Sequence, residues 1–126
     1  MKKENQWSAE FGKVLRSQGA LTYPCIASFE TPRGWPDVHI VHRMWTGLVE
    51  RKAEKTRIEE HQKVMMRDII RRTKIAYYCV VARHVGNDVI MVTYVSDTLE
   101  ECHLLECTYS TFLRSMSDAV SGQSRP

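Results

Sequence analysis

The sequence predicts an α/β domain, because segments with the apolar spacing of a helix alternate with shorter segments that have the character of strands. Trp7, Phe11 and Leu15 recur at the four-residue interval that places side chains on one face of a helix. Residues 37–43 alternate between two faces as a half-buried strand does, and residues 75–83 form an apolar run typical of a buried strand. The chain of 126 residues is long enough to bury a core as one domain.

The first half of the chain is predicted to form one helix and three strands. Gly19 ends the helix, and Pro24 favours a place at a sheet edge or a bulge for the first strand. A short turn at residues 43–46 separates the next two strands, which predicts a hairpin. The predicted ranges are a helix over residues 8–18 and strands over residues 21–29, 37–43 and 47–53.

The second half is predicted to hold a helix, two strands and a helical end. Residues 56–59 have the form of a capping box, and the apolar face of the following helix extends to about Arg72. The predicted ranges after this helix are strands over residues 75–83 and 89–95, and one or two short helices between residues 97 and 120. We therefore expect residues 1–120 to form a single domain and residues 121–126 to be a flexible tail.

Two acidic residues and a lysine stand at positions where the predicted hairpin would bring them together. Asp37 begins the second strand, and Glu50 and Lys52 share one face of the third. Two carboxylates suit Mg²⁺, which takes oxygen ligands and keeps several waters. A bound metal lowers the pKa of a water to make hydroxide, and Lys52 would orient that water or stabilise the developing negative charge. These residue types therefore predict a site for hydrolysis of a phosphodiester bond.

The same residues have structural alternatives. Asp37 after a proline could be a turn residue, and Glu50 with Lys52 could be a surface ion pair. Leu48 and Val49 make the third strand largely apolar, however, and a carboxylate is costly to bury there unless a cation satisfies it. We therefore favour the metal site.

Gly34-Trp35-Pro36-Asp37 together with Glu50-Arg51-Lys52 resembles the PD-(D/E)XK nuclease superfamily, above all its VRR-NUC branch and related phage Holliday junction resolvases. The resemblance spans about residues 8–83. It implies a restriction-endonuclease-like αβββαβ core with a mixed central sheet flanked by helices. It also implies that Glu10 joins Asp37 and Glu50 as a metal ligand for Mg²⁺ or Mn²⁺, and that Gln62 is a further catalytic residue.

The distribution of charge indicates a nucleic-acid partner. The net charge is +3, and between residues 51 and 74 nine Lys or Arg residues stand against four Asp or Glu. This stretch starts at the predicted catalytic strand, so a phosphate-binding surface would adjoin the metal site. A solvated helix face is the alternative interpretation. The candidate nucleic-acid contacts are Lys55, Arg57, Lys63 and Arg67.

Composition limits the cellular setting. No segment has the roughly 20 consecutive apolar residues of a membrane span, and the N-terminal residues lack the apolar run of a signal peptide. We expect a cytoplasmic protein, with no membrane partner, that could act as a phage protein in its host cell. The four cysteines form no Cys-x-x-Cys pair and are expected to be reduced thiols.

Two classes of function follow. The first is a metal-dependent endonuclease that selects branched DNA, such as a Holliday junction, by shape, since one small domain has few means to read sequence. The second is a catalytically silent protein that keeps the nuclease fold and binds nucleic acid or a protein. We expect a homodimer, because symmetric junction cleavage needs two active sites. Residues 89–120 are a candidate interface, with completion of the monomer's core as the alternative.

Overall fold

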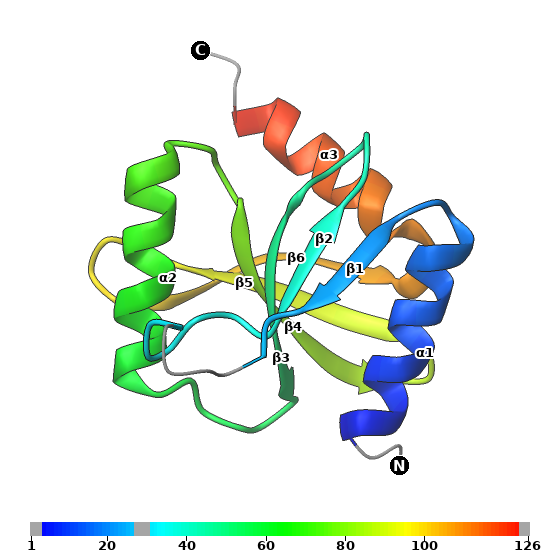
Figure 1. Cartoon of the computed structure of the whole chain (residues 1–126), viewed down its shortest axis with the longest axis horizontal. Coiled ribbons are helices and arrows are strands. Elements are labelled where there is room, and N and C mark those ends of the chain that lie inside the picture. Colours follow the sequence, from blue (N-terminus) through cyan, green and yellow to red (C-terminus); the bar gives the residue numbers. More distant parts are fainter. Residues whose placement is uncertain (1–3, 27–30, 124–126) are drawn as a thin grey trace.

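The computed structural model describes residues 4–26 and 31–123, which form a six-stranded sheet between two layers of helices (Figure 1). Helices α1 and α3 cover one face, and α2 covers the other. The predicted mixed sheet flanked by helices is confirmed, and the first six elements follow the predicted αβββαβ order. The elements are α1 (Glu4–Ser17), β1 (Leu21–Pro24), β2 (Val38–Val41), β3 (Gly47–Ala53), α2 (Glu60–Thr73), β4 (Cys79–Gly86), β5 (Val89–Val95), β6 (Glu101–Thr108), the 3₁₀ turn η1 (Tyr109–Thr111) and α3 (Phe112–Gln123).

The strands lie in the sheet in the order in which they occur in the chain. Strands β3 and β4 are parallel, and every other neighbouring pair is antiparallel. Parallel neighbours need a crossover connection, and α2 provides it. The hairpin of β2 and β3 is confirmed, with Val38 opposite Val49 and Ile40 opposite Gly47. The helix α2 therefore starts after β3, the strand of Glu50 and Lys52, and packs on one face of the sheet against β4 and β5.

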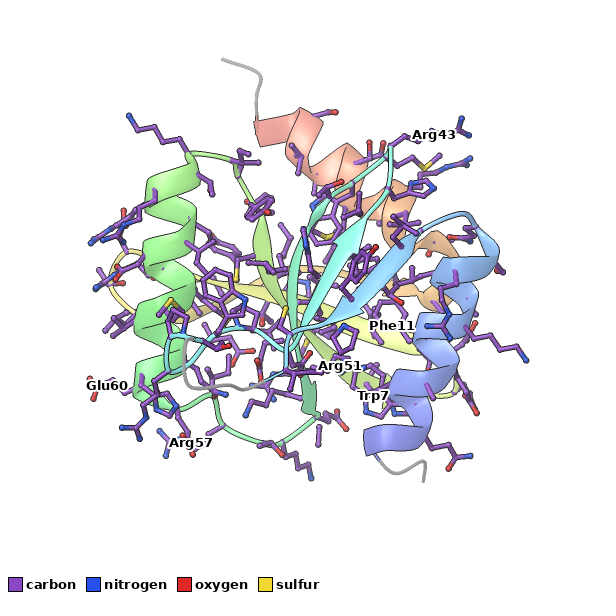
Figure 2. All side chains as sticks on the ribbon, viewed as in Figure 1. Trp7, Phe11, Arg43, Arg51, Arg57 and Glu60 are labelled. Atoms are coloured by element: carbon purple, nitrogen blue, oxygen red, sulfur yellow. The ribbon has the colours of Figure 1, made fainter. Side chains whose placement is uncertain are left out.

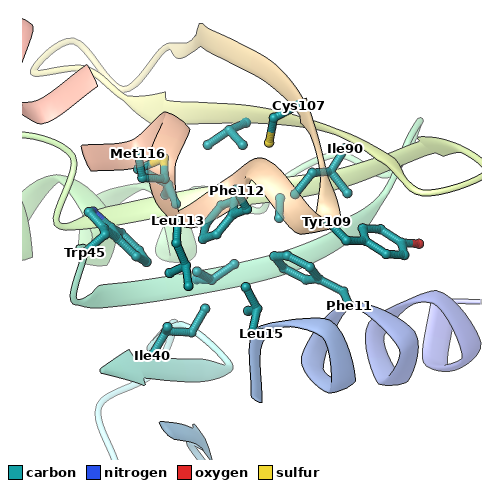
Figure 3. Packing of buried hydrophobic residues seen from close by; sticks show 14 of the residues in the cluster. Phe11, Leu15, Ile40, Trp45, Ile90, Cys107, Tyr109, Phe112, Leu113 and Met116 are labelled. Atoms are coloured by element: carbon teal, nitrogen blue, oxygen red, sulfur yellow. The ribbon is translucent and has the colours of Figure 1, made fainter. Parts of the chain in front are cut away.

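Alternation along the strands sends side chains into two separate cores. Ile40, Val49 and Val80 point toward α1 and α3, where Phe112 packs edge to face against Phe11 with ring centroids 5.1 Å apart (Figure 3). Leu48 and Val81 point the other way and pack against α2. Side chains on the α2 face of β3 are therefore separated from the larger core by the sheet itself.

The region predicted as a possible dimer interface contributes largely to the monomer's own core. Ile90 and Val92 of β5 are fully buried, and so are Phe112 and Met116 of α3. The alternative in which these residues complete the core therefore accounts for them. Trp45, 5% exposed, also packs in this core. No helix in the described part of the chain is long and apolar enough to cross a lipid bilayer.

The start of α2 differs from the sequence prediction. The helix begins at Glu60 with Glu59 as its N-cap, and the amide nitrogen of Glu59 donates to Gln62 Oε1 at 3.0 Å. The predicted capping box at residues 56–59 is therefore wrong. Thr56 belongs instead to the connection from β3, because its carbonyl oxygen accepts a hydrogen bond from Arg83.

The strands and the C-terminal region bring further corrections. Residues 101–108, predicted to be helical, form the edge strand β6 along β5. Its alternation is obscured because one face is only partly covered and because β6 has an extra residue, Leu104, where Val92 pairs with Leu105 and Thr93 with His103. Helix α3 continues through Gln123, three residues into the predicted tail. The strand predicted from residue 75 begins at Cys79, and the strand predicted over residues 21–29 ends at Pro24, with residues 27–29 outside the described residues.

Candidate active site

Asp37 lies at the start of β2, and both of its carboxylate oxygens face Arg51 of β3. Arg51 Nε donates to Oδ1 at 3.0 Å, and the amide nitrogen of Arg51 donates to Oδ2 at 3.1 Å. The backbone of Asp37 is fixed as well, because its carbonyl oxygen accepts from the amide nitrogen of Cys25 at 2.8 Å. The carboxylate is about one-third exposed, at 35%. Asp37 is therefore held in place at the surface end of the hairpin.

Glu50 is the buried acid of the site. Its side chain is 9% exposed and faces α2, because it lies two residues from Leu48 of the α2 core and so shares its face of β3. Lys52 Nζ lies 3.9 Å from Glu50 Oε2 and is also largely buried, at 15% exposure. Gln62 Nε2 donates to the same oxygen at 3.4 Å. The structure thus brings Lys52 and Gln62 together at one carboxylate oxygen.

Gln62 joins the site to the start of α2. Its Oε1 accepts from the amide nitrogen of Glu59, while its Nε2 reaches Glu50. The close approach of Gly34 to the same turn packs the loop before Asp37 against the helix, since a Cβ on Gly34 would lie 2.6 Å from the carbonyl oxygen of His61. The loop that carries Asp37 and the helix that carries Gln62 are therefore in direct contact.

The register of the hairpin decides whether the two acids suit a common metal ion. The paired ladder of β2 and β3 ends with Val38 opposite Val49, and Asp37 and Glu50 are the next residues beyond that pair. Val38 and Val49 point into the core under α1 and α3, so the neighbouring side chains Asp37 and Glu50 belong to the other face of the hairpin. A hard divalent cation takes one or two carboxylates as ligands and completes its shell with water and phosphate oxygens.

Glu10 is not grouped with these two acids. Among residues 4–26 and 31–123, no three His, Cys, Asp or Glu side chains lie close enough to hold one metal ion together. Glu10 belongs to α1, which packs through Trp7 and Phe11 on the face of the sheet opposite α2. Its predicted role as a third ligand stays a prediction.

Three of the four candidate DNA contacts surround one cavity beside the site. Lys55 and Arg57 lie in the connection from β3 to α2, and Lys63 lies in the first turn of α2. The cavity has a volume of about 410 Å³, and its other lining side chains include Thr93, Glu101 and His103. Arg67 lies outside this cavity lining, and its Nε contacts Asp68 Oδ1 at 3.2 Å. Figure 2 shows Arg51 and Arg57 in the same lower half of the molecule.

Two arginines at the site were not found from the sequence. Arg51, which holds Asp37, occupies the middle position of Glu50-Arg51-Lys52, where the motif specifies no residue type. Arg83 is 5% exposed and lies beside Lys52 in the parallel register of β3 and β4. The sequence did indicate that Arg83 is buried, because Arg83 shares a face with Cys79 and Val81 in a strand predicted to be buried from its apolar character.

Glu101 is the ionic partner of Arg83 and has an altered titration. Burial acts to raise its pKa, but hydrogen bonds from Arg83 and Thr93 and the charges of Arg83 and Lys63 outweigh burial, so the pKa lies below the ordinary value for glutamate. The unfolded chain then binds a proton more readily than the folded protein as the pH falls. Ionised Glu101 therefore stabilises the fold above its unfolded pKa of about 4.3, and this contribution is lost as the pH falls through the lower folded pKa.

We expect Glu101→Gln to be less stable than the natural protein at pH 7, with a difference that shrinks as the pH falls below about 4.3. Urea unfolding followed by circular dichroism between pH 7 and pH 3 measures this difference. Asp97→Asn provides a control, because Asp97 forms an exposed ion pair with Arg71. A constant difference between Glu101→Gln and the natural protein at all pH values would contradict the lowered pKa.

The sheet order, the crossover by α2 and the hairpin with acids at its end define a restriction-endonuclease-like α/β fold. The solved structure of Hjc from Archaeoglobus fulgidus, a Holliday junction resolvase from an archaeal hyperthermophile, is similar to this chain. The TM-score is 0.60 and the identity 11%, and the match covers 86% of this chain and 98% of that chain. At this identity the likeness establishes the fold alone. No protein-family model and no curated protein sequence matches the chain.

Proposed function

We propose that this protein is a metal-dependent endonuclease that hydrolyses DNA phosphodiester bonds and prefers branched DNA. The observation that carries the proposal is that Lys52 and Gln62 both lie at the Glu50 carboxylate, while Asp37 directly precedes β2 at the same end of the hairpin. The acids and the lysine sit on neighbouring strands whose positions are fixed by the sheet, and catalytic groups need such fixed positions.

Asp37 and Glu50 hold the Mg²⁺ or Mn²⁺ ion in this proposal. When bound, the ion polarises the scissile phosphate and lowers the pKa of a water that attacks it. Gln62 fixes the rotamer of Glu50 through its amide, and Arg51 fixes Asp37. Lys52 points at the same carboxylate oxygen as Gln62, and its ammonium stabilises negative charge on the phosphate oxygens as the bond to the attacking water forms. Glu10 remains a proposed third ligand.

The basic residues around the cavity supply the binding surface. Lys55, Arg57 and Lys63 lie within a short stretch of chain next to Lys52, and each would neutralise a backbone phosphate. Arg67 is a fourth proposed contact, although its pairing with Asp68 lowers the charge that it presents. Contacts of this kind position DNA without reading its sequence. Selection of branched DNA by shape is therefore part of the proposal, supported by the fold shared with a Holliday junction resolvase.

A homodimer would allow the enzyme to cut two symmetric strands of a junction, because one chain carries one candidate site. The VRR-NUC branch and a phage origin are supported by the sequence motifs alone. The VRR-NUC branch, the phage origin and the homodimer are therefore all parts of the proposal.

A second candidate is a nucleic-acid-binding protein without catalytic turnover. The observation that favours it is the engagement of both Asp37 oxygens by Arg51, which places a positive charge where the metal is expected. In an active enzyme the ion would bind Asp37 beside Arg51 or displace its guanidinium.

Cleavage assays separate these two functions. We expect the purified protein to nick a four-way junction in Mg²⁺ or Mn²⁺, to cut linear duplex of the same sequence more slowly, and to do neither in EDTA. Light scattering at micromolar concentration should give twice the monomer mass of 14.6 kDa. Junction binding without cleavage in either metal would support the silent protein. Equal cleavage of junction and duplex by a monomer would leave a general nuclease.

A further inference from the structure

Arg83 is a buried arginine that the proposed chemistry does not use. It lies in the middle of β4 and is 5% exposed. Its Nε and Nη2 donate to the two carboxylate oxygens of Glu101 on β6, each at 2.8 Å. Thr93 of β5 donates to Glu101 Oε2 at 2.6 Å. A bidentate arginine–carboxylate pair of this kind has a fixed direction. Strands β5 and β6 therefore set the orientation of the guanidinium.

The third nitrogen of the Arg83 guanidinium, Nη1, contacts the backbone of the connection between β3 and α2. Arg83 Nη1 donates to the carbonyl oxygens of Ala53 at 2.8 Å, Glu54 at 3.3 Å and Thr56 at 2.5 Å. The carbonyl oxygen of Ala53 also accepts from the amide nitrogen of Thr56 at 3.2 Å, whereas Arg83 is the donor described for the carbonyl oxygens of Glu54 and Thr56. The turn therefore combines one backbone hydrogen bond with a buried cation that satisfies two further carbonyl groups. The start of the β3–α2 connection therefore follows the position of Arg83.

This connection has a functional side chain at each end. Lys52 precedes Ala53 directly, and Gln62 lies in the first turn of α2, where its side chain both caps the amide of Glu59 and donates to Glu50. Figure 1 shows the connection passing from the lower end of β3 to the lower end of α2. Its conformation determines how the start of α2 is placed relative to β3, and thus whether Gln62 reaches Glu50.

The same connection carries two of the basic residues of the cavity. Lys55 and Arg57 are exposed, and the turn held by Arg83 lies next to both. Long exposed side chains have no fixed position of their own, so the backbone that carries them decides where their charges lie. Loss of the turn would therefore displace the proposed phosphate contacts together with Gln62.

We propose that Arg83, held by Glu101 and Thr93, is a positioning residue that fixes the β3–α2 connection and so aligns Lys52, Gln62 and the basic cavity. This inference rests on the proposed nuclease function for its kinetic consequence, but its structural consequence is independent of activity. Arg83 also lines the cavity, but its guanidinium is paired with Glu101 and with backbone carbonyl oxygens. It acts through the backbone of residues 53–56.

Hydrogen exchange tests the structural consequence without any cleavage. We expect Arg83→Met to increase amide exchange in residues 54–62 at least about tenfold, while the β2–β3 hairpin keeps its protection. Arg71→Met is the matched control, because Arg71 Nε also contacts a carboxylate at 2.8 Å but is exposed and holds no backbone carbonyl among the described contacts. The control should leave exchange in residues 54–62 unchanged.

A second variant distinguishes loss of the turn from a general failure to fold. Arg83→Met alone leaves Glu101 without its ionic partner, so the test also includes Arg83→Met combined with Glu101→Leu, because replacement of both members of a buried pair by apolar residues is often tolerated. This double variant should fold and should show the same raised exchange in residues 54–62. Unchanged exchange in the folded double variant would overturn the proposal, whatever the activity.

Single-turnover cleavage of a junction tests the kinetic consequence. At saturating DNA we expect the folded double variant to be slower by roughly tenfold to a hundredfold, as small displacements of catalytic groups cause. Gln62→Ala should slow cleavage by a smaller factor in the double variant than in the natural protein. The reason is that loss of Arg83 and loss of the Gln62 side chain both remove the contact between Gln62 and Glu50. Full additivity would overturn the positioning role. Raised exchange in the double variant of a protein that cuts no DNA would instead support the turn and reject the nuclease.

Discussion

Asp37→Asn and Glu50→Gln are each expected to reduce metal-dependent DNA cleavage by at least about a thousandfold, because each removes a charged metal ligand at nearly constant size. The fold should persist. The amide that replaces the Asp37 carboxylate keeps an oxygen that can accept from the backbone nitrogen of Arg51, and the amide that replaces the Glu50 carboxylate keeps an acceptor near Gln62 and Lys52. Single-turnover cleavage of a four-way junction in Mg²⁺ measures the loss, and circular dichroism verifies the fold.

Asp97→Asn is a matched control for the aspartate. Asp97 Oδ1 accepts from Arg71 Nε at 2.8 Å, much as Asp37 Oδ1 accepts from Arg51 Nε at 3.0 Å, yet Asp97 lies away from the hairpin. This control should cleave as the natural protein does. Wild-type rates in either Asp37→Asn or Glu50→Gln would place the metal site elsewhere on the molecule.

Binding measurements give the same prediction a second readout. Isothermal titration with Mn²⁺ should show a saturable site in the natural protein that is lost in both variants. Junction binding in EDTA should survive, because the basic cavity is not lined by either of the two carboxylates. Loss of DNA binding together with cleavage would show that the substitutions disturb the surface rather than the metal.

The sequence was most informative about the β2–β3 hairpin, where successive side chains alternate between the two faces of each strand. Asp37 and the pair of Glu50 and Lys52 could be placed on facing strands because a period of two fixes each side chain to one face, and the short turn fixes the register. Gln62 followed from the resemblance and was found at Glu50. The order of helices and strands up to β5 was predictable for the same reason.

The failures have a common physical origin in contacts that are distant along the chain. The carbonyl oxygens of Ala53 and Thr56 accept from Arg83, about 30 residues further on, and the helix is capped instead by Glu59 and Gln62. Strand β6 is an edge strand with one incompletely covered face, so its sequence lacks clear alternation. Arg51 was missed because nothing in its neighbours shows that its side chain turns back to Asp37.

Lys52→Ala is expected to slow the chemical step far more than it weakens DNA binding. Its ammonium lies 3.9 Å from Glu50 and its side chain is 15% exposed, so Lys52 faces the proposed metal site, whereas the neighbouring Lys55 and Arg57 are exposed. A group that acts on charge developing in the transition state contributes to the rate and little to ground-state affinity. We expect a loss of about 10²–10³-fold in single-turnover rate, similar to the loss of one oxyanion donor, with junction affinity changed by less than about threefold.

Two comparisons make the result specific to the chemistry. Lys13→Ala removes an exposed lysine from α1 and should change neither quantity, whereas Lys55→Ala should weaken binding and leave the rate at saturating DNA near normal. Because Lys52 also lies beside the buried Glu50, its removal is expected to raise the affinity of that carboxylate for Mn²⁺ or leave it unchanged, as the competing positive charge is gone. Equal losses of rate and affinity in Lys52→Ala would make Lys52 a phosphate anchor, and a loss of Mn²⁺ binding would show that it is needed to hold Glu50 in place.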